Sequence, residues 1–165
     1  MLPNITTLIG ASFIPMVLGF VWFHPKLFGG ETWYDLAKLH GSDRSDVSTI
    51  KLLSTMILNF IIAFGFYNLV IHQFSIFSVV GGEMDLLKTG TAKAFLDEYG
   101  NTFQSFGHGF FHGIIGTFLF VVPILGYVCI FEKKSFKYFL VYLGYWLISL
   151  SIMGGILGQW GATHV

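Results

Sequence analysis

The sequence predicts an all-α membrane protein, a single domain over residues 1–165 with four transmembrane helices in an up-and-down bundle. Only 11% of the residues are charged and 54% are hydrophobic, and the mean hydropathy is +0.71. A bilayer core about 30 Å thick needs a helix of about 20 residues. Because lipid offers no hydrogen bonds to the backbone, each apolar stretch of that length should be helical. Such stretches cover residues 4–23, 49–74, 103–131 and 136–158.

The first span leads into a loop that we expect to hold a short amphipathic helix over residues 31–41. Trp33 and Leu36 lie on one face of that helix at helical spacing. Aromatic rings with a polar edge favour the headgroup level of a membrane, so this helix should lie on the membrane surface. The residues we place at the interface are Trp22, Trp33, Tyr34 and Trp160.

Small residues in the third and fourth spans predict where helices pack closely. Gly109 and Gly113 are four residues apart, and Gly154 and Gly158 repeat that spacing. Helices in lipid associate through close backbone approach and interhelical hydrogen bonds. Asn59, in the middle of the second span, is therefore expected to hydrogen-bond to a neighbouring helix.

The cations predict the orientation of the chain. Seven of the nine Lys and Arg residues fall in the first and third loops or beside them, and the other two lie in the second loop. An excess of Lys and Arg in short loops marks the cytoplasmic side. We therefore expect a multi-pass protein of the cell (cytoplasmic) membrane with both termini outside the cytoplasm.

Three histidines form the only constellation that suggests chemistry. His108 and His112 are four residues apart and share one helix face. His72 lies 21 residues beyond Lys51, and His112 lies 20 residues before Glu132. At helical rise both histidines are then about 30 Å from the inner surface. The three imidazoles are expected to meet at the outer end of the second and third spans.

Three interpretations of these histidines remain open. They suit a zinc or copper ion, with the Glu83 carboxylate as a possible fourth ligand. A bis-histidine haem would need His72 with one of the other two, because neighbours on one helix cannot approach iron from opposite faces. The simplest interpretation is that they are interfacial side chains. We expect this last case, with no cofactor; a metal ion or haem is the alternative.

The remaining features bear on function. No catalytic constellation stands out, so we expect no enzyme. No ionisable residue lies near the middle of a span, which argues against a pump or an ion-coupled transporter. The formal net charge is zero, which argues against a nucleic-acid partner. We expect a structural or accessory subunit, a homo-oligomer or part of a larger membrane complex, in contact with the lipid bilayer. A passive conduit or binder for a small or lipidic molecule is a further alternative.

Two segments resemble a known family. The first segment is residues 19–29, GFVWFHPKLFG, which are followed by Trp33. The second is residues 131–136, FEKKSF, which precede the tyrosine-rich fourth span and Gly158-Gln159-Trp160. These segments resemble a family of small bacterial integral membrane proteins known as domain of unknown function 1761. The resemblance implies four helices and a bacterial cytoplasmic membrane, and it implies no activity. The second loop is longer here than in the family pattern.

Overall fold

The computed structural model describes residues 2–27, 30–37 and 48–163. It confirms the predicted all-α polytopic fold, with four helical spans that are long and apolar enough to cross a membrane. The first span is α1 (Ile5–Trp22) and the second is α3 (Thr49–Val70). The third span consists of α6 (Phe106–Gly116), the π-helical turn η2 (Thr117–Val121) and α7 (Val122–Phe131). The fourth span is α8 (Phe136–Trp160). Shorter helices are α2 (Gly30–Ala37), α4 (Phe74–Val79), the 3-10 turn η1 (Leu86–Lys88) and α5 (Gly90–Tyr99).

Each span begins at a polar side chain that caps its first turn. The first N–H groups of a helix have no partner within it, and an Asn or Ser at the N-cap accepts a hydrogen bond from one of them. The caps are Asn4 for α1, Ser48 for α3, Ser105 for α6 and Ser135 for α8, with donor–acceptor distances of 3.2, 3.4, 3.3 and 3.2 Å. A polar capping residue therefore stands at the start of every span, and the third span begins at Phe106, three residues later than predicted.

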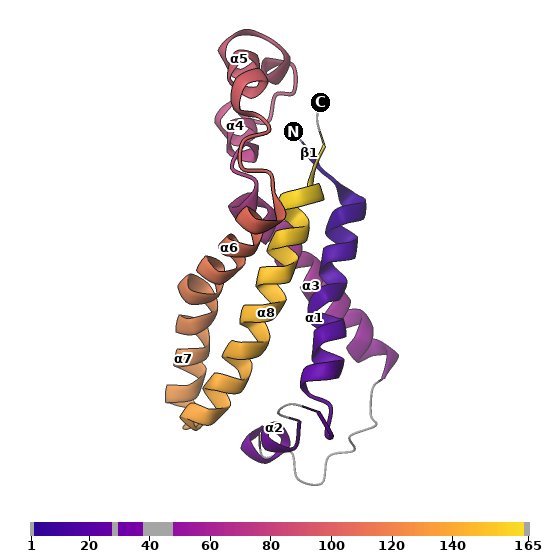
Figure 1. Cartoon of the computed structure of the whole chain (residues 1–165), viewed down its shortest axis with the longest axis vertical. Helices are drawn as coiled ribbons and strands as arrows, with labels where there is room; N and C mark the ends of the chain where they lie inside the picture. The colour runs from indigo at the N-terminus through magenta and orange to yellow at the C-terminus, as the bar shows by residue number, and fades with distance from the viewer. Residues whose placement is uncertain (1, 28–29, 38–47, 164–165) are drawn as a thin grey trace.

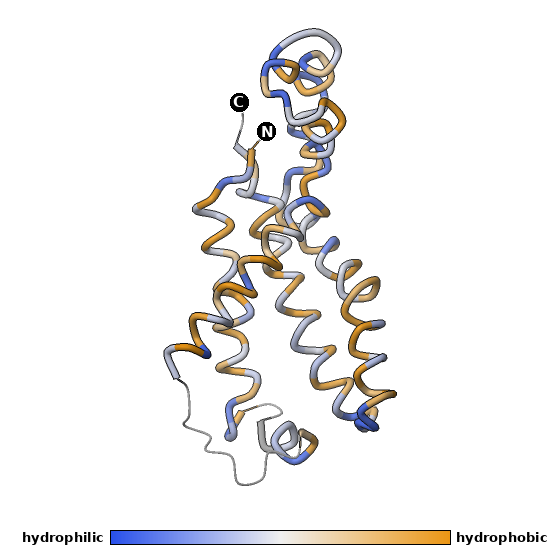
Figure 2. The backbone as a smooth tube through the Cα atoms, turned by 180° about the vertical axis from the view of Figure 1, so that it is seen from behind, coloured by the Kyte–Doolittle hydropathy of each residue, from blue (hydrophilic) through white to orange (hydrophobic). Residues whose placement is uncertain are grey.

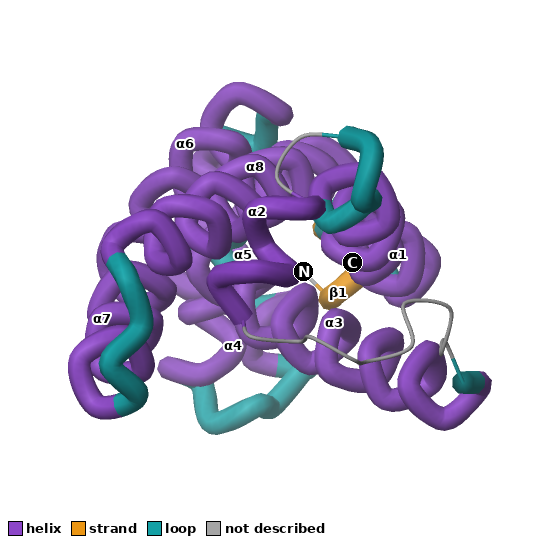
Figure 3. Tube along the Cα trace, turned by 90° about the horizontal axis from the view of Figure 1, so that it is seen from below, coloured by secondary structure: helices purple, strands orange, loops and turns teal. Residues whose placement is uncertain are grey.

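Helix α8 is the central element of the fold. The four spans run alternately up and down (Figure 1). Helix α8 packs against α6 on one side and α1 on the other, and α1 also packs against α3 (Figure 3). The core at these contacts includes Leu8, Tyr67, Met153 and Leu157, all fully buried.

The four glycines predicted to mediate packing lie together between α6 and α8. A Cβ atom on Gly109 would overlap the carbonyl oxygen of Gly154, and one on Gly113 would overlap the backbone of Ser151. A Cβ atom on Gly158 would lie 2.6 Å from the carbonyl oxygen of Ser105. Because no side chain larger than hydrogen fits, these two backbones approach as closely as helices in lipid can.

Polar residues concentrate at the two ends of the molecule. Orange, apolar backbone covers the spans, and blue segments gather at the upper and lower ends (Figure 2). The upper end in Figure 1 carries both termini, α4 and α5, and the lower end carries α2. This separation of polar ends and apolar middle is what a bilayer requires of a polytopic protein.

The two termini pair in a short sheet that the sequence did not predict. Strand β1 (Leu2–Pro3) pairs antiparallel with β2 (Ala162–Thr163), and the Asn4 N–H donates to the Gly161 carbonyl at 2.7 Å. Two-residue strands carry no detectable alternation. The pairing arises because α1 and α8 already bring the ends together.

The helix predicted in the first loop is present over the described residues Gly30–Ala37; the predicted residues 38–41 lie outside the described part. The Trp33 Nε1–H donates to the Tyr142 hydroxyl at 2.9 Å, and Tyr34 packs edge-on against Trp33 at 5.0 Å. Helix α2 therefore docks on α8.

The other two aromatic residues predicted to lie at the interface are both near span ends. Trp22 donates from Nε1 to the Val141 carbonyl at 3.1 Å and packs on Gly144, where a Cβ would lie 2.9 Å from the indole ring. Trp160 is 57% exposed at the end of α8. The Trp22 bond to a backbone carbonyl makes this residue a contact between α1 and α8.

Asn59 is buried in α3, with 4% of its surface exposed. Its Nδ2 atom has no hydrogen-bond partner among the described residues. The amide nitrogen therefore does not form the expected interhelical hydrogen bond within the described part of the chain.

Candidate metal centre

The structure brings together the three histidines singled out from the sequence. The Nε2 atoms of His72 and His112 are 3.1 Å apart, those of His72 and His108 are 3.2 Å apart, and those of His108 and His112 are 3.0 Å apart. The three atoms thus form a nearly equilateral triangle. Within the part of the chain that the structure describes, these three histidines form the one group of His, Cys, Asp or Glu side chains that could hold a metal ion.

Two helix ends place these side chains. His72 follows Ile71, the C-terminal cap residue of α3, whose side chain is 1% exposed and anchors this end of the helix in the core. His108 lies in the first turn of α6, where its N–H bonds to the capping Ser105 hydroxyl at 3.3 Å. His112 follows one turn later, so both rings lean toward His72 from the same face.

The triangle cannot be satisfied by hydrogen bonds alone. A neutral imidazole nitrogen is either a donor or an acceptor, never both. Among three mutually close nitrogens, at least two must therefore carry the same role, and their contact is repulsive. A cation bound by all three nitrogens removes this conflict, because each unprotonated nitrogen can then offer its lone pair to the positive charge.

The spacing of the nitrogens suits a tetrahedral ion. Zinc–nitrogen bonds of 2.0–2.1 Å place neighbouring ligands about 3.3 Å apart in a tetrahedron, close to the 3.0–3.2 Å observed. A haem would instead need its macrocycle between two axial nitrogens. His72 and His112, at 3.1 Å, leave no room for it. The geometry favours a small ion over haem.

Residues of the long second loop lie against the triangle, although His72 stays exposed. The ring of Phe103 stacks on His108 with centroids 5.2 Å apart, and Phe103 adopts a φ of 63° that non-glycine residues rarely adopt. Gln73, next to His72, donates from Nε2 to the carbonyls of Tyr99 at 3.1 Å and Thr102 at 2.7 Å. These contacts hold the loop against the site.

Sequence reasoning missed Phe103 and Gln73. The only signal for Gln73 in the sequence was its position directly after His72. A glutamine in a loop is not distinctive by itself, because many such side chains bind only water. Nothing in a sequence marks the left-handed backbone of Phe103. Strained residues of this kind cluster at functional sites, where the surrounding structure holds them in place.

The described residues supply three ligands and no fourth. Glu83, the carboxylate considered from the sequence, does not belong to the group that the structure brings together. Three protein ligands with a fourth position left for water or another molecule are also the arrangement of catalytic zinc sites. Nδ1 of His112 is buried with no hydrogen-bond partner among the described residues, so no described group fixes the tautomer of that ring.

Comparison with known proteins yields one relationship. A family model described as "Protein of unknown function (DUF1761)" matches residues 6–158, which include the second and third spans, nearly all of the first and fourth, and the three histidines. No curated protein and no solved structure matches the chain.

Proposed function

The chain belongs to the family described as "Protein of unknown function (DUF1761)", and from the geometry of its own site we propose that it binds one zinc or copper ion through His72, His108 and His112. The single observation that carries the proposal is the triangle of Nε2 atoms, 3.0–3.2 Å apart. Neutral imidazole suits both zinc and copper.

The proposed role is binding or transfer of the ion, in line with the expectation that the chain is no enzyme. An open fourth position leaves room for a ligand from another molecule to reach the bound ion. The site lies at the upper end of the spans, which the cation distribution predicts to be the outer face of the cell membrane. An ion there would be reached from outside the cytoplasm.

Metal titration of the detergent-purified full chain tests this proposal. After chelation, zinc or copper is added back and the bound metal is counted by elemental analysis. We expect one ion per chain, and a cobalt-loaded sample should show the absorption of a tetrahedral complex with nitrogen ligands. A stoichiometry that stays the same when all three histidines are replaced by alanine would refute the site. A haem absorption band in the purified protein would support the alternative cofactor instead.

We further propose that the protein works in a homo-oligomer or as an accessory subunit of a membrane complex. The third span supports this, because only 11% of an 18-residue apolar stretch within it is buried in the single chain. The mass of the protein in mild detergent tests it. A monomer without any co-purifying protein would refute the proposal.

A further inference from the structure

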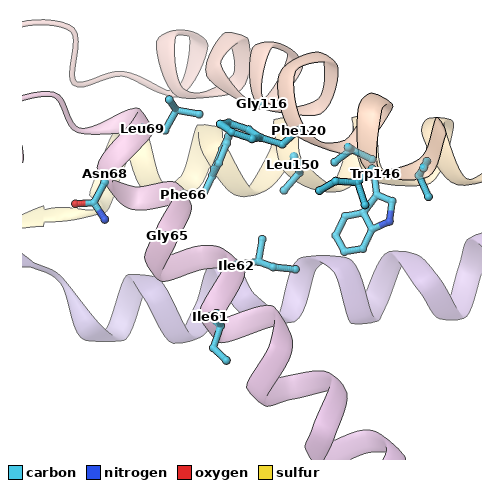
Figure 4. A pocket seen from close by; sticks show the side chains of 13 residues that line it. Ile61, Ile62, Gly65, Phe66, Asn68, Leu69, Gly116, Phe120, Trp146 and Leu150 are labelled. Carbon is cyan, nitrogen blue, oxygen red and sulfur yellow. The ribbon is translucent and has the colours of Figure 1, made fainter. Parts of the chain in front are cut away.

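An apolar groove lies among α3, the third span and α8, and neither the histidines nor the glycine contacts use it (Figure 4). Its volume is about 670 Å³, within the range of about 300–1,000 Å³ that is usual for ligand sites. Residues that line it include Ile61, Gly65, Phe66, Phe120, Ile124 and Trp146.

The groove exists because α3 meets α6 but diverges from α7. Figures 1 and 3 show α3 crossing obliquely toward α1 while α7 continues on the other side of α8. Where α3 and α6 meet, Phe66 packs on Gly116, at which a Cβ would lie 2.6 Å from the Phe66 ring. This contact forms the floor of the groove. Gly65 leaves open space beside it, since a Cβ there would meet nothing within 4 Å.

A π-helical turn shapes the wall formed by the third span. The Val122 N–H donates to the Thr117 carbonyl, five residues back, and Pro123 follows without an N–H to donate. The turn η2 contributes Phe120 and Val121 to the groove. Single π turns within helices recur at functional sites, so this wall differs from an ordinary lipid-facing helix surface.

The medium at the groove is hydrocarbon. Its rim residues Ile61, Phe120 and Ile124 are 59%, 56% and 62% exposed, and all three lie within apolar spans. Water in such a groove would find few hydrogen-bond partners, because Asn68 and Trp146 carry the only polar side-chain atoms among the described lining residues. We propose that the groove binds one hydrocarbon chain of a membrane phospholipid as a specific site, distinct from the lipid that merely surrounds the protein.

The size of the groove favours a flexible chain over a helix from a second copy. The α3 side of the groove runs from Ile61 to Leu69, about 12 Å at helical rise. A transmembrane helix of about 20 residues is about 30 Å long, so a helix from a second copy would meet this groove over less than half of its length. A single acyl chain is narrow enough to follow the groove.

Lipid retention by the full chain tests this proposal without requiring a bound metal. Wild-type protein is reconstituted with dioleoylphosphatidylcholine, re-extracted in mild detergent and weighed by native mass spectrometry. Gly65→Leu adds a bulky side chain at the groove lining, at a position where a Cβ meets nothing within 4 Å, and Gly10→Leu is the matched control. Gly10 is an exposed glycine of α1 outside the groove, where a Cβ also meets nothing within 4 Å.

We expect one retained phosphatidylcholine on the wild type and the control, and at least a fivefold lower retention on Gly65→Leu. Ile124→Trp, at the exposed rim, gives a second way to block the groove if Gly65→Leu fails to fold. Equal retention by the blocked variants, or no retained lipid on the wild type, overturns the proposal. The proposal is also overturned if the wild type carries no lipid and forms a dimer that Gly65→Leu converts to a monomer. That result assigns the groove to a second copy of the chain.

Discussion

The backbone of Gly109 lies directly against the carbonyl of Gly154, so that α6 and α8 touch with no side chain between them. The spacing of the glycines in the sequence predicted a close approach of helices at this place. It also positions the histidines, because His108 and His112 flank it on α6. Stability of this helix pair and geometry of the site are therefore linked.

Replacement of Gly109 by alanine should destabilise the protein. The added methyl group overlaps the Gly154 carbonyl, and overpacking of this kind typically costs about 1–3 kcal/mol. We expect a clear fall in the thermal unfolding midpoint in detergent. The control is Gly107→Ala on the same helix, where a Cβ meets nothing within 4 Å and helix propensity favours alanine. A fall of equal size in both variants would contradict the close approach.

Replacement of any one of the three histidines by alanine should lower metal affinity at least tenfold. Even loss of a group that only orients a ligand typically costs 10- to 100-fold, and here a ligand itself is removed. Competition of each variant with a chelator of known affinity measures the change. The control is His24→Ala, because His24 accepts a hydrogen bond from the Lys26 N–H at Nδ1 and lies in the first loop, away from the site. Unchanged affinity in His72→Ala would show that α3 contributes no ligand.

Replacement of Trp33 by phenylalanine should loosen α2 from α8. The indole N–H bond to the Tyr142 hydroxyl, 2.9 Å long, is worth about 1 kcal/mol. Its loss should speed hydrogen exchange of the α2 amides roughly fivefold. Tyr142→Phe should have the same effect, and the double variant should add little to either single one. Additive effects would mean that the two side chains act separately.

The sequence sufficed for the spans because each element carries its own signal. The start of α3 at Ser48 and that of α8 at Ser135 follow from caps beside long apolar runs. The depth argument for His72 and His112 succeeded for a similar reason, since helical rise converts residue counts into distance. These are local or one-dimensional properties, and a sequence contains them.

The remaining features depend on how the spans pack. The pairing of Leu2 with Thr163 requires both chain ends at one place. The groove beside Gly65 arises from the angle between α3 and α7, which no apolar pattern specifies. The backbone of Phe103, with its φ of 63°, is imposed by its neighbours. None of these has a sequence period or spacing of its own.

Replacement of Asn59 by leucine should maintain or raise stability. A buried amide with an unpaired Nδ2 bears a desolvation cost of about 1–3 kcal/mol, and leucine has a similar size without polar atoms. The thermal unfolding midpoint in detergent should therefore not fall. A marked loss of stability would show that the amide forms an interhelical bond in the membrane, as the sequence alone had suggested.

Labelling of single cysteines should show both termini outside the cytoplasm. The background is Cys129→Ser, which removes the only native thiol. Thr163→Cys then reports the upper end, beside the paired termini, and Glu132→Cys reports the lower end, between the third and fourth spans. The two sites are separated by α8, whose 25 residues extend about 37 Å at helical rise.

A membrane-impermeant maleimide added to intact bacterial cells that express these variants should label Thr163→Cys and spare Glu132→Cys until the cells are lysed. The reason is the cation excess at the lower end, where Lys26, Lys51 and Lys137 lie beside the membrane and favour the cytoplasm. Labelling of Glu132→Cys alone would invert the orientation. It would also move the histidine triangle to the cytoplasmic face, so that any ion it binds would come from inside the cell.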